Sequence, residues 1–185
     1  MSIFRTENNK SMIDLNTERM SGRGDVVING MKANKLFGLN DLCKKYVTKS
    51  TNILELGCHN CVSTRLFCHY SDNVTAVDNY QSPYVNSTIK EHIGFNFVKS
   101  KFQDFFNKCD KRFDLIYIDG DHKYNSVKND IISSLKIIKP GGILSGHDYY
   151  TSTNSDVPRV IEEILYKYDK PEVFSDSSWL VHIPL

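Results

Sequence analysis

The chain has 185 residues, of which 40% are hydrophobic and 24% charged, a profile typical of one soluble domain with a single core. Its 23 basic and 22 acidic residues leave a net charge of +1, so the composition gives no sign of a nucleic-acid partner. No apolar run approaches the roughly 20 residues of a membrane span, and the N-terminal segment lacks an apolar signal core. We therefore expect a cytoplasmic protein that binds neither nucleic acid nor membrane.

The polar segment at residues 1–30 is predicted to be an appendage to a single domain over residues 31–185. That domain opens with a helical pattern formed by Leu36, Leu39, Leu42, Cys43 and Tyr46. From residue 52 onward, short β-rich runs alternate with helical patterns, which indicates parallel βαβ units. Seven strands are expected, at residues 52–56, 74–77, 95–98, 113–118, 142–146, 172–175 and 179–183. The last two are close enough to form an antiparallel hairpin, so the sheet is expected to be mixed.

Two helices in the second half of the chain have clear patterns. In the first, apolar residues recur at helical spacing and end before Pro140, with the members Val127, Ile131, Leu135 and Ile138. In the second, Asp156 is a candidate N-cap and Pro158 suits the first turn. Its buried stripe is formed by Val157, Val160, Ile161, Ile164 and Leu165.

Polar residues follow the first five predicted strands, where a doubly wound sheet binds its ligands. Gly57 lies at the first strand-to-helix turn, and Asp78 ends the next strand roughly 20 residues later, a spacing at which a carboxylate can bind ribose hydroxyls. The other polar strand ends are Ser100 with Gln103 and Asp104, Asp119 with Asp121 and His122, and His147 with Asp148. These residues are candidates for one site at one edge of the sheet.

Five segments occur in a recognisable order, namely ELGCHNCVST, AVDNY, FQDF, DLIYIDGDHKY and IKPGGILSGHDYY. Together they resemble the class I S-adenosylmethionine-dependent methyltransferases, and most closely the small-molecule O-methyltransferase branch. The resemblance covers roughly residues 30–185. It implies an α/β, Rossmann-like, doubly wound seven-stranded mixed sheet with strand order 3-2-1-4-5-7-6 and helices on both faces. It also implies methyl transfer to a small hydroxylated acceptor, such as a sugar or a phenol.

The same resemblance assigns residues to the cofactor, S-adenosyl-L-methionine. Glu55 is expected to orient its amino-acid end through the loop, Asp78 to bind the ribose, and Gln103 with Asp104 to lie near the adenine amino group. The full cofactor-binding set implied in this way is Glu55, Gly57, Cys61, Ser63, Asp78, Asn79, Gln103, Asp104 and Asp119.

One position departs from the family pattern E-x-G-x-x-x-G-x-S-T, because Cys61 stands where the second glycine is expected. A cysteine adopts positive φ only at a cost, so either the loop has shifted or cofactor affinity is reduced. Two alternatives follow. Cys61 suggests a cofactor-binding pseudoenzyme or partner subunit, and Cys58-x-x-Cys61 at a strand-to-helix turn suggests a thiol redox protein.

The resemblance also implies a divalent cation, Mn²⁺ or Mg²⁺. Asp119, His147 and Asp148 match the positions of three metal ligands in catechol-type O-methyltransferases, where the middle ligand is usually Asp. An imidazole at that position favours Mn²⁺ over Mg²⁺. Without a metal, His122 or His147 could act as the general base, although Asp121 could also simply cap the next helix and leave His122 exposed.

Overall fold

The computed structural model of the protein describes residues 36–150 and 155–185 in full. Nearer the N-terminus it describes the backbone of four two-residue strands, β1 (Ile3–Phe4), β2 (Ile13–Asp14), β3 (Val27–Ile28) and β4 (Met31–Lys32). These pair antiparallel, β1 with β2 and β3 with β4. Most of the predicted appendage at residues 1–30 lies outside the described residues.

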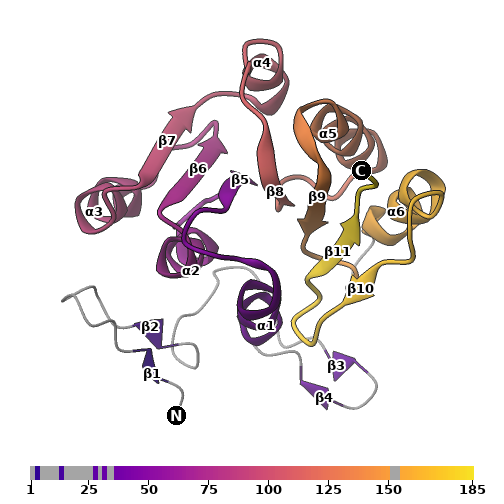
Figure 1. Cartoon of the computed structure of the whole chain (residues 1–185), viewed down its shortest axis with the longest axis horizontal. Helices are drawn as coiled ribbons and strands as arrows, with labels where there is room; N and C mark the ends of the chain where they lie inside the picture. The colour runs from indigo at the N-terminus through magenta and orange to yellow at the C-terminus, as the bar shows by residue number, and fades with distance from the viewer. Residues whose placement is uncertain (1–2, 5–12, 15–26, 29–30, 33–35, 151–154) are drawn as a thin grey trace.

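A seven-stranded sheet forms the centre of the molecule (Figure 1). Its strands are β5 (Asn52–Leu56), β6 (Asn73–Asp78), β7 (Phe95–Lys99), β8 (Phe113–Ile118), β9 (Ile138–Gly146), β10 (Glu172–Val173) and β11 (Trp179–His182). They are arranged in the order β10-β11-β9-β8-β5-β6-β7. Strands β5 to β9 pair parallel with one another, whereas β11 is antiparallel to β9 and to β10. Numbered within this sheet, the order is 3-2-1-4-5-7-6, so the predicted topology is confirmed.

Helices cover both faces of the sheet (Figure 1). The helices α1 (Phe37–Tyr46), α2 (Val62–Tyr70) and α3 (Pro83–Glu91) pack on one face. The other face is covered by α4 (Phe102–Phe106), α5 (Tyr124–Ile137) and α6 (Val157–Leu165). Each described helix is too short or too polar to cross a membrane.

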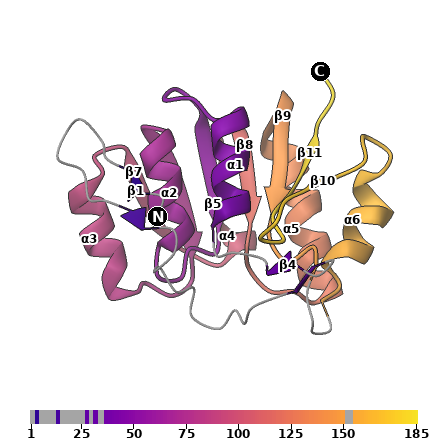
Figure 2. The same ribbon diagram turned by 90° about the horizontal axis from the view of Figure 1, so that it is seen from below.

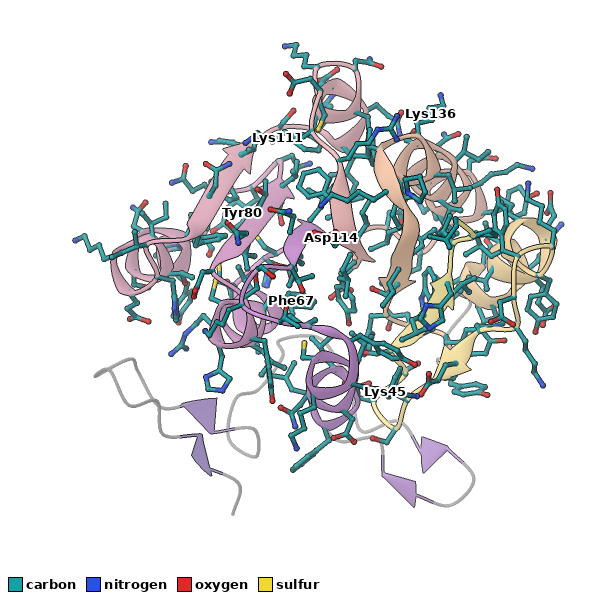
Figure 3. All side chains as sticks on the ribbon, viewed as in Figure 1. Lys45, Phe67, Tyr80, Lys111, Asp114 and Lys136 are labelled. Carbon is teal, nitrogen blue, oxygen red and sulfur yellow. The ribbon has the colours of Figure 1, made fainter. Side chains whose placement is uncertain are left out.

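The core has two layers because successive strand residues point to opposite faces. Ile53 belongs to the cluster under α1 and α2, whereas its neighbour Leu54 belongs to the cluster under α5 and α6, and both are fully buried. On the first face, Phe67 of α2, labelled in Figure 3, packs edge-on against Tyr117 of β8, with 5.2 Å between ring centroids. Burial on both faces explains why the parallel strands read as nearly continuous apolar runs.

The parallel strands all end at one edge of the sheet. Strand β11 runs the opposite way, and Figure 2 shows the C-terminus at the other edge. The chain passes from β5 to β6 and β7 on one side and then crosses to β8 and β9 on the other. This reversal of strand order opens a crevice beyond the ends of β5, β6 and β8.

Several strand ends are shifted by one or two residues from the predicted bounds, and two further local details differ from the sequence predictions. Helix α5 ends at Ile137 and β9 starts at Ile138, so Pro140 lies inside a strand whose register with β8 is irregular between Phe113 and Leu115. Asp156 does occupy the N-cap position of α6, but its side chain forms no cap there. Instead, it accepts a hydrogen bond from the backbone N–H of Tyr124 (3.0 Å), in the first turn of α5.

Candidate active site

The first strand-to-helix turn is held tightly against the neighbouring strands. The N–H of Gly57 donates to the carbonyl of Val77 (2.9 Å), and that of Asp119 donates to the carbonyl of Leu56 (2.8 Å). Gly57 has φ 92°, and a Cβ at this position would lie 2.2 Å from the carbonyl oxygen of Asp119. Only glycine fits this close approach of β5 to β8.

Glu55 lies behind the turn and is fully buried. The hydroxyls of Ser63 and Thr64, in the first turn of α2, donate hydrogen bonds to its two carboxyl oxygens. Burial raises the pKa of Glu55 to about 8, an effect that the two hydroxyls oppose. Glu55 therefore ties the end of β5 to the start of α2 and fixes the loop between them.

Cys61 precedes α2 and adopts the left-handed conformation, with φ 60° and ψ 29°. The backbone of a glycine is thus retained although the residue is a cysteine. Its Sγ is turned inward: Cys61 is fully buried and Cys58 is only 3% exposed. The two thiols share a hydrogen bond. This bond and burial both raise the pKa of Cys58, whereas the bond lowers the pKa of Cys61. Redox-active cysteines are usually partly exposed, so this burial does not support the redox alternative.

Asp78, at the end of β6, organises the entrance to the turn. Its Oδ2 accepts the backbone N–H of His59 (2.9 Å), and its Oδ1 accepts that of Tyr80 (2.9 Å). The rings of His59 and Tyr80 lie 6.4 Å apart, and Tyr80 is exposed. One carboxylate therefore joins the loops that follow two adjacent strands, and its remaining lone pairs can accept further hydrogen bonds.

A cavity of about 540 Å³ opens beyond these strand ends. Six of the nine predicted cofactor residues line it, namely Gly57, Asp78, Asn79, Gln103, Asp104 and Asp119. The other three, Glu55, Cys61 and Ser63, are buried outside the lining, where they hold the loop in place. The cavity is large enough for a drug-sized ligand and is rich in polar groups at one edge of the sheet.

Sequence reasoning missed several residues that line this cavity. His59, Phe102 and Gly120 lie within the segments that carry the resemblance but were not assigned to the cofactor, and Ser126 gave no signal, because loop and helix residues reach the cavity only through the three-dimensional arrangement. A Cβ on Gly120 would lie 2.6 Å from the Phe102 ring, so these two residues form one wall. Asp130 did leave a signal, since it interrupts the apolar stripe of α5 between Val127 and Ile131.

A group of acidic and imidazole side chains adjoins the cavity. Asp119, His122 and Asp148 each offer a ligand atom, and these atoms lie within 4.8 Å of one another. His122 Nε2 lies 2.6 Å from Asp148 Oδ2, and the His122 side chain is 49% exposed. The structure thus brings His122 into the group that the sequence expected to contain His147.

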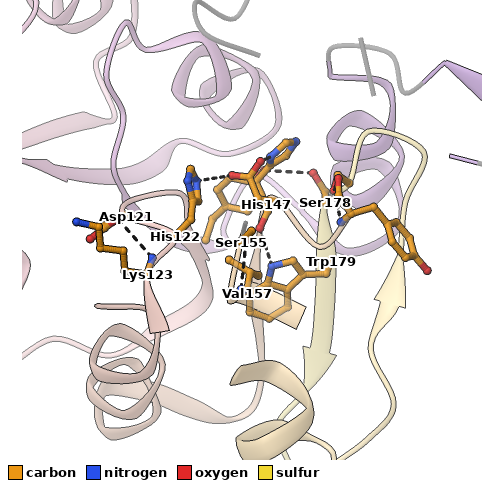
Figure 4. A network of polar contacts seen from close by, with 12 residues as sticks. Asp121, His122, Lys123, His147, Ser155, Val157, Ser178 and Trp179 are labelled. Carbon is orange, nitrogen blue, oxygen red and sulfur yellow. Dashed lines mark hydrogen bonds and ion pairs between the residues drawn. The ribbon is translucent and has the colours of Figure 1, made fainter. Parts of the chain in front are cut away.

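Figure 4 shows His147 near His122, and both imidazoles contact the carboxylate of Asp148. The Nδ1 of His147 is 2.9 Å from Asp148 Oδ1, the oxygen that His122 does not contact, and the His147 side chain is only 10% exposed. Asp148 has φ 64°, and the carbonyl of His147 accepts the indole N–H of Trp179 (3.1 Å). The left-handed turn at Asp148 and the Trp179 contact hold the Asp148 carboxylate between the two imidazoles.

Solved structures of methyltransferases share this fold. A putative rRNA methylase from Clostridium thermocellum superposes with a TM-score of 0.60 and 16% identity, over 78% of this chain and 93% of that one. The O-methyltransferase from Bacillus cereus in complex with SAH gives 0.57 and 17%, over 80% and 79%. The N-methyltransferase NodS from Bradyrhizobium japonicum gives 0.56 and 16%, over 80% and 95%. At these identities the likeness concerns the fold.

The sequence itself matches a family model. No curated protein sequence matches the chain. Residues 54–149, more than half of the chain, match the model of a methyltransferase domain, and this range runs from β5 through the turn after β9. It therefore contains the Gly57 turn, Asp78 and the Asp119–His122–Asp148 group. The chain belongs to the class I S-adenosylmethionine-dependent methyltransferases.

Proposed function

We propose that the chain transfers a methyl group from S-adenosylmethionine to an oxygen atom of a small hydroxylated acceptor, with a divalent cation at Asp119, His122 and Asp148. The observation that carries this proposal is the convergence of these three side chains at the edge of the cavity. Two carboxylates and an imidazole are ligands that Mn²⁺ accepts readily. The group adjoins the Gly57 turn, because Asp119 also packs against Gly57.

The residues present fit the cofactor. The cavity of about 540 Å³ lies at the reversal of strand order, and Asp78 offers it a carboxylate that two backbone N–H groups already orient. Cys61 adopts the positive φ that a glycine would adopt, so the loop has the expected backbone conformation. The pseudoenzyme alternative, which rested on a shifted loop, loses this support. We assign Asp78 to the ribose hydroxyls, and Glu55, Cys61 and Ser63 to the support of the loop.

The chemistry divides simply between cofactor and chain. S-adenosylmethionine supplies a methyl group on a sulfonium, which is intrinsically reactive. The chain must hold the acceptor in line with that methyl group and remove the acceptor's proton. A cation at Asp119, His122 and Asp148 supplies Lewis-acid polarisation of an acceptor hydroxyl. His147 acts as a positioning residue, since its Nδ1 lies 2.9 Å from Oδ1 of Asp148 and fixes that carboxylate.

The acceptor is assigned to the small hydroxylated class for chemical reasons. Asp119, His122 and Asp148 would hold a cation, which would supply Lewis-acid polarisation suited to a phenol or sugar hydroxyl. The nearly neutral net charge of +1 offers little attraction to a polyanion. Because structural relatives include rRNA methylases and an N-methyltransferase, the acceptor panel should contain catechols, sugars, amines and an rRNA fragment.

The test is methyl transfer measured with and without a chelator. EDTA should abolish transfer to catechols or sugars, and Mn²⁺ should restore it at least as well as Mg²⁺ because one ligand is imidazole. His122→Ala should reduce turnover by about 100-fold or more, on the scale of lost metal or base assistance. His182→Ala, an exposed histidine on β11, is the matched control.

Three outcomes would contradict parts of this proposal. Transfer that survives chelation would eliminate the cation and leave the His122–Asp148 pair as the base. Transfer only to the rRNA fragment would eliminate the small acceptor. Transfer only to amines would eliminate O-methylation.

A further inference from the structure

Asp130 is a carboxylate in an unusual place. It lies in the middle of α5, on the side of the helix that faces the sheet, and is only 6% exposed. Burying a carboxylate is costly unless it is paired, and an apolar residue would be cheaper at this position. Burial raises the pKa of Asp130 to about 7, an effect that a hydrogen bond from Gln103 opposes and the charge of Asp121 reinforces.

The partners of Asp130 leave acceptor capacity free. Gln103 of α4 hydrogen-bonds to its carboxylate, and Ser133 Oγ donates to Gln103 Oε1 (3.4 Å), which turns the Gln103 amide nitrogen toward Asp130. Within the described part of the chain, no Lys, Arg or His forms an ion pair with Asp130. A carboxylate has about four lone-pair sites, so most of its acceptor capacity remains for a ligand.

Asp130 and Gln103 both line the cavity that we assign to the cofactor. Asp130 lies almost two turns into α5, roughly 9 Å along the helix from Tyr124. The reacting group at Asp119 and His122 precedes that helix, and Asp78 lies at the end of β6, which is separated from β8 by β5. The α4–α5 side of the cavity is built from other elements than the strand ends that carry Asp78 and Asp119, which leaves this side for the base of the nucleoside.

We propose that the carboxylate of Asp130, oriented by Gln103, accepts a hydrogen bond from the exocyclic amine of the adenine and makes the site selective for a 6-amino purine. This inference rests on the cofactor site of the proposed function. Adenine presents a donor at C6, which a carboxylate accepts, whereas a 6-oxo purine presents an acceptor, which a carboxylate repels. Asp104, the residue expected at this place from sequence, is exposed.

The experiment compares the binding of two ligands by calorimetry, S-adenosylhomocysteine and its 6-oxo analogue S-inosylhomocysteine, at a pH above the raised pKa of Asp130, so that the side chain is ionised. The parent protein should prefer the 6-amino ligand by at least about tenfold, because a site built to receive a hydrogen bond rejects a ligand that cannot donate it. Asp130→Asn should reduce this preference by about tenfold or more, since its amide can donate to the 6-oxo group. Asp110→Asn, an exposed change after α4 and outside the cavity lining, is the control.

The outcomes separate this inference from the proposed function. Binding of S-adenosylhomocysteine without discrimination by the parent, or an unchanged preference in Asp130→Asn, would overturn the inference alone. Loss of the preference in Asp104→Asn instead would return the role to Asp104. Failure of the parent to bind either ligand would overturn the cofactor site as well. Asp130→Leu tests the preference for the 6-amino ligand without a polar side chain at this position. Thermal melting of each variant verifies that it folds.

Discussion

At the scale of single residues, Asp78 combines two tasks in one carboxylate. It accepts the backbone N–H groups of His59 and Tyr80 and faces the cavity with its remaining lone pairs. Substitution of a side chain with both tasks should weaken ligand binding more than substitution of one that only lines the cavity. Its removal releases two loops and also removes one contact with the ligand.

We predict that Asp78→Ala weakens S-adenosylhomocysteine binding by about 1–3 kcal/mol, the scale for a lost charged hydrogen-bond acceptor. Titration calorimetry measures the change directly. Asp72→Ala serves as control, since Asp72 is an exposed aspartate that pairs with Lys49. An affinity equal to that of the parent would mean that the ribose does not bind at the end of β6.

At the scale of elements, the loop from Gly57 to Cys61 shows how a helix start can keep its geometry without glycine. The left-handed backbone at Cys61 costs a non-glycine residue roughly 1–2 kcal/mol. The burial of its thiol and the Glu55 contacts with Ser63 and Thr64 offset that cost by fixing the first turn of α2.

A pair of substitutions at this position should separate strain from packing. Cys61→Ala loses the buried thiol and keeps the strain, whereas Cys61→Gly loses the thiol and relieves the strain. We therefore predict that the Gly variant has a free energy of unfolding about 1 kcal/mol higher than the Ala variant, measured by urea denaturation. Cofactor affinity in Cys61→Gly should equal or exceed that of the parent. An Ala variant as stable as the Gly variant would show that the left-handed backbone carries no cost.

The elements themselves were largely predictable from sequence. Strands β5 and β8 have the predicted bounds, because β-branched and other apolar runs ended by Gly57 or Asp119 leave few alternatives. The start of β9 was not predictable. Ile138 continues the helical spacing of α5, and only its pairing with Phe113 of β8 makes it a strand residue. Pairing between distant segments is a tertiary effect that local patterns do not contain.

The position of the candidate site in the fold was predictable from the sequence, but the arrangement of its side chains was not. Gly57, Asp78 and Asp119 line the cavity as strand ends should. The choice between His122 and His147 depended on the left-handed turn at Asp148, which points its carboxylate between the two rings. Nothing in the residue types around Asp148 signals that turn. Asp130 was visible only as a polar break in an apolar stripe.

At the scale of the whole molecule, two buried carboxyl groups make stability depend on pH. Burial raises the pKa of Glu55 from an ordinary value of 4.5 to about 8, and that of Asp130 from 3.8 to about 7. Between the unfolded and folded pKa values, the folded state binds more protons than the unfolded state does. The free energy of unfolding therefore falls as pH rises through this window, from about pH 4 to about pH 8.

We predict that the urea midpoint of unfolding is higher at pH 5 than at pH 8, and that Glu55→Gln reduces this difference, because a neutral amide carries no desolvated charge at either pH. Asp130→Asn in the same chain should reduce it further, since the second raised pKa is then removed. Glu162→Gln, a change at an exposed position of α6, should leave the difference intact. A midpoint that is constant from pH 5 to pH 8, or a Glu55→Gln variant with the parent's pH dependence, would show that Glu55 is ionised in the folded protein throughout. In that case the hydroxyls of Ser63 and Thr64 outweigh the cost of burial.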